Sequence, residues 1–345
     1  MQLGKLVAGV VLAIAGIAIL FWSLLTQHPS FQEGTSIIAS KEFHIKYLER
    51  HNCTYILNQS FLIKNPSNNT IIDLVYTWLP VNASNQFVRL VETSMEPLYM
   101  KSGEDGVEIL IFNITLPAGG ATWINTTLQV TVEAYSLFIE NAPWLNLPQV
   151  EENTGGKRYW AVENETYVSL AKEIGLNARD PVSASQAIGK WIINNKIYVP
   201  IYRRGAEQAL IIKDGKLKVF GDCEEVADVF VTLTRILGIR SRVVHGIYLL
   251  EDKDVVTMWI KVTDRGLELS DNWGGHAWPQ IYVPQVGWVD VELLEGDAVK
   301  IGNFTQYHIK YGFEEKSFLG STISYCRSMF LEIDALYFTF RRIQS

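Results

Sequence analysis

One of the three cysteines of this chain lies where a thiol could react. Cys223 follows a Gly-Asp turn and opens a segment in which apolar residues recur every three or four positions from Val226 to Leu237, the spacing of an amphipathic helix. Gly238 then provides a helix stop. A thiol at a helix N-terminus faces unpaired backbone N–H groups and the positive end of the helix dipole, and both favour the thiolate. We therefore expect a lowered pKa for Cys223.

A thiolate nucleophile needs a proton acceptor and a group that orients this acceptor. His276 begins a strand-like run that reaches a turn at Pro284, and Asp290 and Glu292 lie on the returning strand. A carboxylate on the second strand of a hairpin can reach an imidazole on the first. The order of Cys, His and acid then predicts a nucleophile, a general base and an orienting group. Because Asp290 and Glu292 share one strand face, both are candidates for the acid.

The residues around these positions resemble the transglutaminase-like superfamily, which shares the architecture of papain-like cysteine peptidases. The resemblance covers roughly residues 160 to 295 and consists of three separate motifs in the family's order. They are GDCEEVADVFVTLTRILGIRSRVVHG from Gly221, GGHAWPQIYVP from Gly274 and GWVDVE from Gly287. The resemblance implies acyl transfer to Cys223 with His276 as the base, acting on a protein or peptide substrate. It admits hydrolysis and transamidation of a primary amine alike.

The acid is the more important of two departures from the family, the other being Arg240 where the family often has Pro. The family's usual Asp comes four residues after the Trp of the last motif, and Glu292 holds that place after Trp288. Asp290 lies two residues earlier. Register selects Glu292 and residue type selects Asp290, so we predict Glu292 as the acid with Asp290 as the alternative. The rival hypothesis is a non-catalytic surface protein with a degenerate core that binds or scaffolds, and the changed acid is its main support.

Signals for metals, cofactors and nucleic acids are weak. His245 lies in an apolar strand without a motif partner, so we interpret it as structural. Cys223, His245 and His276 could ligate zinc, but no C-x-x-C or H-x-x-x-H pair accompanies them, and we predict no metal site. The sequence has no phosphate-binding glycine motif, so we expect no nucleotide and no cofactor. The net charge of -7 argues against nucleic acid as a partner.

The N-terminal segment predicts a membrane anchor. Leu6 to Leu25 is a run of 20 residues without a charge, long enough to cross a hydrocarbon core of ~30 Å. A cleaved signal peptide is the alternative, although its apolar region usually has only ~7–15 residues. Lys5 precedes the run and no Lys or Arg follows until Lys41, so the positive-inside rule places the rest of the chain outside the cell. We predict a single-pass protein of the cell membrane with an extracellular C-terminal domain.

Asn-x-Ser/Thr sequons support this orientation. Eight are present, whereas the composition would give about two by chance, and all eight follow the apolar run. The excess indicates a glycosylated, extracytoplasmic face. The sequon asparagines are Asn52, Asn58, Asn68, Asn82, Asn113, Asn125, Asn164 and Asn303.

The remaining pattern predicts an α+β chain with domains in series. Short stretches of alternating polarity predict an Ig-like β-sandwich, and helices followed by antiparallel strands predict a papain-like, transglutaminase-like core. Cys53 and Cys326 could form a disulfide between the sandwich and the C-terminal tail, or remain two buried thiols. The predicted segments are a transmembrane anchor at 6–25, a β-sandwich at 36–138, a linker at 139–160, a catalytic domain at 161–300 and a β extension at 301–345.

Overall fold

The structure, a computed structural model, describes residues 42–343 except for 104–105, 145–158, 201 and 316–324. No helix within these residues is both long enough and apolar enough to cross a membrane. The predicted anchor at Leu6 to Leu25 lies outside the described residues, so it stays a prediction.

The helices begin where capping side chains satisfy their first N–H groups. Asn164 accepts hydrogen bonds from the second and third residues of the first helix. Asp180 caps the next helix in a capping box with Pro181 at the first position. The helices are α2 (Glu165–Gly175), α3 (Pro181–Asn195), α4 (Ala206–Ala209) and α5 (Cys223–Ile236).

Helix α5 is the centre of the helical layer, and every residue from Cys223 to Arg235 is buried. The helix ends as predicted, because Gly238 adopts a φ of 78°, which glycine reaches without strain. Its start depends on Gly221, where a Cβ would lie 2.5 Å from the side chain of Glu225. The Glu225 carboxylate accepts the N–H of Asp222 at 3.1 Å, so the turn before Cys223 is held tightly.

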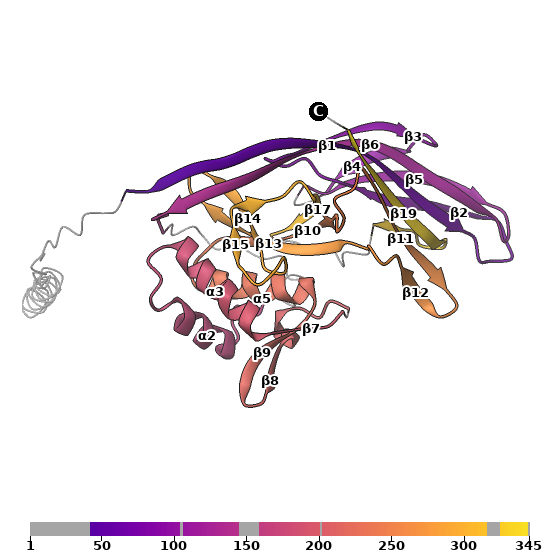
Figure 1. The fold of residues 1–345 in the computed structure, drawn as a ribbon. Coiled ribbons are helices and arrows are strands. Elements are labelled where there is room, and N and C mark those ends of the chain that lie inside the picture. Colours follow the sequence, from indigo (N-terminus) through magenta and orange to yellow (C-terminus); the bar gives the residue numbers. More distant parts are fainter. Residues whose placement is uncertain (1–41, 104–105, 145–158, 201, 316–324, 344–345) are drawn as a thin grey trace, which may run out of the picture. The chain divides into compact units, whose positions relative to one another are not determined.

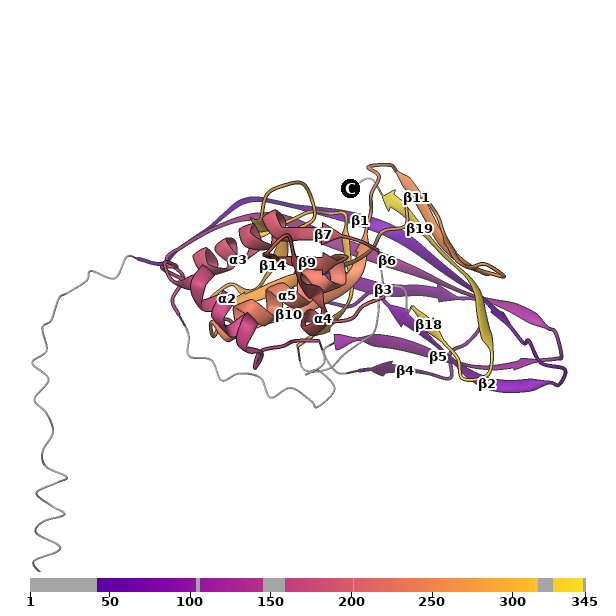
Figure 2. The same cartoon turned by 90° about the horizontal axis from the view of Figure 1, so that it is seen from below.

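A five-stranded antiparallel sheet packs against α5 and carries the rest of the predicted site. The helices lie on one side of this sheet, and Figure 2 shows them in front of it. The long strands of a second sheet cross the other side (Figure 1). The strand order is β15 (Lys300–Ile301), β14 (Gly287–Glu292), β13 (Gly275–Val283), β10 (Ser241–Tyr248) and β17 (His308–Glu314).

A small three-stranded sheet leads the chain to Cys223. The strand that comes first in the chain, β7, pairs in parallel with β9, the strand that directly precedes Cys223, and this puts Tyr198 opposite Gly221. The strands, in the order in which they pair, are β7 (Lys196–Tyr198), β9 (Lys216–Gly221) and β8 (Leu210–Lys213).

The largest sheet among the described residues draws strands from three of the predicted segments. Its central strands come from the N-terminal half, and they pair with strands from residues 255–269, 303–304 and 332–343. The order is β12 (Gly266–Leu269), β11 (Val255–Thr263), β19 (Glu332–Ile343), β1 (His44–Lys64), β6 (Ala121–Glu140) and β16 (Asn303–Phe304), and β3 (Gln86–Thr93) also pairs with β6.

A four-stranded sheet packs against the largest one, and buried residues of both belong to one hydrophobic core. Gln59 in β1 donates a hydrogen bond to the backbone oxygen of Trp78 at 3.0 Å and thereby links the two sheets. The strands are β18 (Cys326–Arg327), β2 (Ile71–Leu79), β5 (Glu108–Leu116) and β4 (Tyr99–Ser102).

The α+β class is confirmed, but an Ig-like sandwich at 36–138 is not. The strands predicted there are present, yet β1 pairs over its C-terminal half with β19 from the end of the chain, so the large sheet extends across the predicted boundaries. The residues from Glu42 onward form one compact unit. The boundaries at 138, 160 and 300 stay predictions.

Cys53 and Cys326 lie in different sheets, on β1 and β18, and both are free thiols in the structure. Of the two alternatives that the sequence leaves open for them, the structure has the unpaired thiols.

Asp290 is the main polar link between the five-stranded sheet and the large sheet. Its Oδ1 accepts hydrogen bonds from Trp278 at 2.8 Å and Gln280 at 2.7 Å. Its Oδ2 accepts from the Tyr135 hydroxyl at 2.9 Å and from the Lys310 ammonium at 3.0 Å. Burial alone would raise the pKa of Asp290, but the Lys310 charge and these donors lower it below its usual value. Asp290 is therefore an ionised structural residue.

We expect Asp290→Asn to lower the free energy of unfolding by about 3–5 kcal/mol, because it leaves the Lys310 charge buried without its partner. The exposed pair of Arg50 and Glu133 supplies the control, and Glu133→Gln should change stability by less than about 1 kcal/mol. Urea unfolding measures both.

Because folding lowers the pKa of Asp290, the stability that this carboxylate contributes is present above about pH 4 and is lost as the pH falls through the pKa of Asp290 in the folded protein. Equal effects of the two substitutions at pH 7 would contradict this.

Candidate active site

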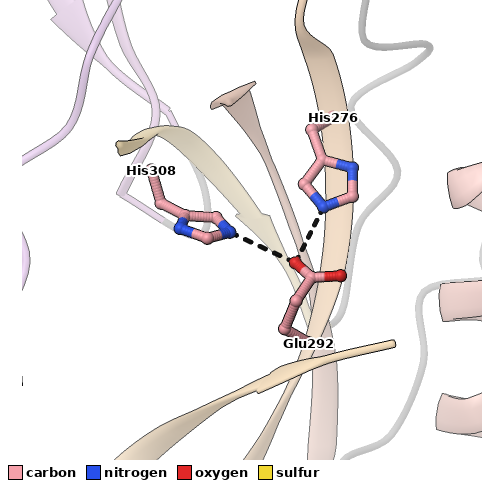
Figure 3. A group of neighbouring side chains, drawn as sticks. All are labelled: His276, Glu292 and His308. Atoms are coloured by element: carbon pink, nitrogen blue, oxygen red, sulfur yellow. Dashed lines mark hydrogen bonds and ion pairs between the residues drawn. The ribbon is translucent and has the colours of Figure 1, made fainter. Parts of the chain in front are cut away.

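His276 and Glu292 form a partly buried hydrogen-bonded pair at adjoining strand ends (Figure 3). Nε2 of His276 lies 2.9 Å from Oε2 of Glu292. The other carboxylate oxygen, Oε1, accepts the backbone N–H groups of Leu293 at 2.8 Å and Leu294 at 2.7 Å. Burial alone would raise the pKa of Glu292, but the His276 charge and its hydrogen bond, together with His308, hold this pKa well below its usual range. Glu292 is thus ionised at neutral pH.

The pairing with Glu292 also decides what His276 can do. Since the carboxylate accepts a hydrogen bond from Nε2, the neutral ring carries its proton there and leaves Nδ1 as the acceptor. The ring stacks on Trp278 with centroids 5.5 Å apart, which further limits its rotation. His276 can therefore act as a base through Nδ1.

Cys223 is the first residue of α5, and its thiol lies against the residue that follows His276. The backbone N–H of Ala277 donates to the sulfur, and the two residues share a buried cluster with Ala227 and Val243. The side chain of Cys223 is 6% exposed. The predicted nucleophile, base and acid are thus brought to one place in the structure.

The expected lowering of the Cys223 pKa is wrong. Burial raises this pKa well above the usual value for a thiol, and the carboxylates of Asp222 and Glu224 raise it further. The Ala277 N–H works in the opposite direction but is outweighed. The position of Cys223 at a helix N-terminus could be predicted from the sequence. The exclusion of water from its thiol could not, because it depends on the packing of segments that are distant in sequence. The resting thiol is therefore neutral.

A pocket of about 400 Å³ opens beside His276 and Glu292. Tyr198, Tyr248 and Trp273 provide its aromatic walls. Burial raises the pKa of Tyr198, and the charges of Cys223 and Asp222 raise it further. The remaining lining residues are Lys196, Leu250, Gly274, Gly275, Leu294 and Glu295.

Asp290, the alternative acid, is engaged in the structural network described above, and Glu292 is the carboxylate that pairs with His276. Register therefore selects the His276 partner better than residue type does. Residue type does not identify the acid, because Asp290 and Glu292 lie on one strand face but contact different residues of the large sheet and of β17.

His245 lies in a buried charged cluster apart from the His276 pair. Its Nε2 is 3.2 Å from Glu314 and 3.3 Å from Arg203. Arg203 in turn donates to Asp228 of α5 at 2.9 Å. Burial raises the pKa of Asp228 to about 6, although Arg203 works against this. The cluster ties α5 to β10 and β17, which agrees with the structural interpretation of His245.

His308 belongs to the site and was missed by the sequence analysis. Its Nε2 lies 3.1 Å from the same Glu292 oxygen that His276 contacts, and its Nδ1 lies 2.9 Å from the Thr305 hydroxyl. It begins β17, beyond the predicted end of the catalytic domain at residue 300. Only the sheet order, which puts β17 beside β10, could have indicated it.

Residues 168–293 match the sequence profile of the Transglutaminase-like superfamily, and this segment includes Cys223, His276 and Glu292. These residues form a transglutaminase-like domain. No curated protein matches the chain.

Solved structures similar to this chain include a proposed cysteine protease from Cytophaga hutchinsonii. It is 11% identical with a TM-score of 0.48, over 88% of this chain and 94% of that one. Another is the periplasmic domain of TgpA from Pseudomonas aeruginosa bound to ethylmercury. It is 15% identical with a TM-score of 0.31, over 72% of this chain and 88% of that one.

The raised pKa of Cys223 in the transglutaminase-like domain predicts slow alkylation at neutral pH. We expect the rate with iodoacetamide to increase with pH and to have its midpoint above the ordinary value of about 8.5. Replacing both Cys53 and Cys326 with Ser isolates the signal of Cys223, and mass spectrometry follows it. The urea-unfolded protein is the control and should titrate near the ordinary value. A midpoint below that of the unfolded chain would contradict the raised pKa.

Proposed function

We propose that this protein is a thiol-dependent acyl-transfer enzyme that cleaves amide or peptide bonds. The observation that carries the proposal is the partly buried His276–Glu292 pair, at 2.9 Å, beside the Cys223 thiol at the start of α5. This combination within a transglutaminase-like domain supplies a nucleophile, a base and an orienting acid.

The first step follows from the neutral state of the thiol. As the sulfur of Cys223 attacks the substrate carbonyl carbon, its proton moves to Nδ1 of His276, and the ionised Glu292 stabilises the imidazolium that forms. The Cys223 N–H has no partner within the helix and can donate to the developing oxyanion. One such donor contributes roughly 3 kcal/mol to transition-state stabilisation.

The second step releases the two products. The imidazolium gives its proton to the leaving amine, the carbon–nitrogen bond breaks, and a thioester on Cys223 remains. Water then attacks the thioester with His276 as the base, which yields a carboxylic acid and restores the thiol. A primary amine in place of water would give a new amide. We propose hydrolysis as the main reaction because small amines are scarce outside a cell.

The aromatic pocket supports a protein or peptide as the substrate. Tyr198, Tyr248 and Trp273 offer apolar surface to one substrate side chain, while Lys196 and Glu295 provide polar groups among the lining residues. The pocket touches the base and the acid, so a side chain held there would keep the neighbouring amide close to the thiol.

The proposal predicts that turnover depends on three residues. In the full-length protein with a library of quenched fluorescent peptides, Cys223→Ser should abolish cleavage. Glu292→Gln should lower kcat by orders of magnitude, about 10⁴-fold where a comparable acid has been neutralised, because the imidazole loses its orientation. Cys53→Ser and Cys326→Ser are the matched controls and should retain activity.

The same assay separates the alternatives. New peptide N-termini indicate peptidase activity, release of ammonia indicates an amidase, and incorporation of a fluorescent primary amine indicates transamidation. Full turnover by Cys223→Ser would refute the thiol mechanism. Turnover that persists in Glu292→Gln but not in Cys223→Ser would reduce the triad to a dyad.

We also propose that the catalytic domain lies outside the cell, anchored by Leu6 to Leu25. Exposure of all eight sequon asparagines supports this, since a glycan needs an accessible side chain. Asn164 caps α2 and Asn82 binds the N–H of Val88 through Oδ1, whereas a glycan attaches to Nδ2. Both positions are thus compatible with modification.

This placement predicts the outcome of proteolysis on intact cells. Protease added outside should remove the domain, and an antibody against the C-terminus should lose its signal on blots. A cytoplasmic marker protein must remain intact in the same sample. Protection of the domain until the cells are lysed would refute the extracellular placement.

A further inference from the structure

Three atoms of a kind that binds metals converge beside the pocket. They are Nε2 of His276, Nε2 of His308 and Oε2 of Glu292, all within 4.8 Å of one another (Figure 3). The carboxylate oxygen lies 2.9 Å and 3.1 Å from the two nitrogens. In a tetrahedral zinc site, bonds of about 2.0–2.2 Å place ligand atoms roughly 3.3 Å apart. The two distances to the carboxylate are already near this spacing, whereas a separation of up to 4.8 Å within the group would have to shorten for an ion to bind.

The groups that hydrogen-bond these three side chains are of the kind that surrounds the ligands of a protein metal site. Histidine ligands usually have their second ring nitrogen held by an oxygen, and His308 has Thr305 Oγ1 at 2.9 Å from Nδ1. Oε1 of Glu292 is held by the backbone N–H groups of Leu293 and Leu294. These contacts fix two of the three ligands and keep Oε2 directed at the histidines.

Access and ligand type also suit a cation. The side chains of His276, Glu292 and His308 are 12%, 5% and 2% exposed. His276 and Glu292 line the pocket, so an ion bound to them would be reached from it. Two imidazoles and one carboxylate are a ligand set that zinc accepts.

We propose that His276, Glu292 and His308 form a binding site for a divalent transition-metal ion, of which zinc is the representative. The sequence alone predicted no metal site, because zinc was weighed only on Cys223, His245 and His276 and no C-x-x-C or H-x-x-x-H pair accompanies them. His245 lies instead with Arg203 and Glu314. Among the described residues, His276, Glu292 and His308 are the group whose ligand atoms converge in this way.

The site has a regulatory consequence that rests on the proposed function. A metal on Nε2 of His276 displaces the proton from this nitrogen, and the neutral ring then carries its proton on Nδ1. Nδ1 can no longer accept the proton of the Cys223 thiol, so the attack on the substrate is blocked. The bound ion is therefore an inhibitor, and its removal restores the base.

Direct binding tests the site without any assay of activity. Zinc chloride titrated calorimetrically into metal-free full-length protein should show one site. His308→Gln should weaken its affinity by more than about 100-fold, because loss of an outer partner alone already costs about 10–100-fold. His51→Gln removes an exposed histidine as the control and should bind like the wild type, as should Cys223→Ser. Equal affinity in His308→Gln and the wild type, or loss of binding in Cys223→Ser, would overturn the proposal.

Cobalt in the wild-type protein covers the case in which His308→Gln does not fold. Two nitrogens and one oxygen should give visible d–d bands without a thiolate charge-transfer band. A charge-transfer band that disappears in Cys223→Ser would assign the metal to the thiol and refute the site.

Inhibition is measured separately, as loss of peptide cleavage on adding zinc and its recovery with EDTA. Binding without any cleavage activity would defeat the proposed function alone, and cleavage without binding would defeat the metal site alone.

Discussion

A carboxylate kept away from water determines the arrangement of this site. Glu292 stays ionised while buried because the charge of His276 and hydrogen bonds from His276 and His308 lower its pKa, and two backbone N–H groups also donate to it, which makes four donors in all. Each of these donors is held in a fixed position. Because all of them must reach the Glu292 carboxylate, the position of His276 relative to the start of α5 is fixed as well. The same four donors make the site precise and leave His276 little freedom to turn.

A second buried cluster holds the helix that carries the thiol. Arg203 neutralises Asp228 on α5 and Glu314 on β17, and His245 lies between these elements. Removing one member would leave charge without compensation in the interior. The five-stranded sheet is thus joined to α5 by charges behind the site, and to the large sheet by Asp290.

The catalytic candidates could be predicted from the sequence because each belongs to a local pattern. Cys223 follows a capping turn, and the register of a hairpin puts Glu292 within reach of His276. His308 and the raised pKa of the thiol could not be predicted in this way. Both depend on segments that are distant in sequence, and helix or strand periodicity contains no information on which strand becomes the neighbour of β10.

The pairing of β1 with β19 imposes an order on folding. Thr54 pairs with Ile343, so one edge of β1 stays open until residue 343 has been synthesised. Contacts of such sequence separation are slow to form, and an unpaired strand edge is prone to join other chains. The nascent protein therefore exposes an aggregation-prone edge until β19 has been synthesised, and this edge must be kept apart from those of other chains.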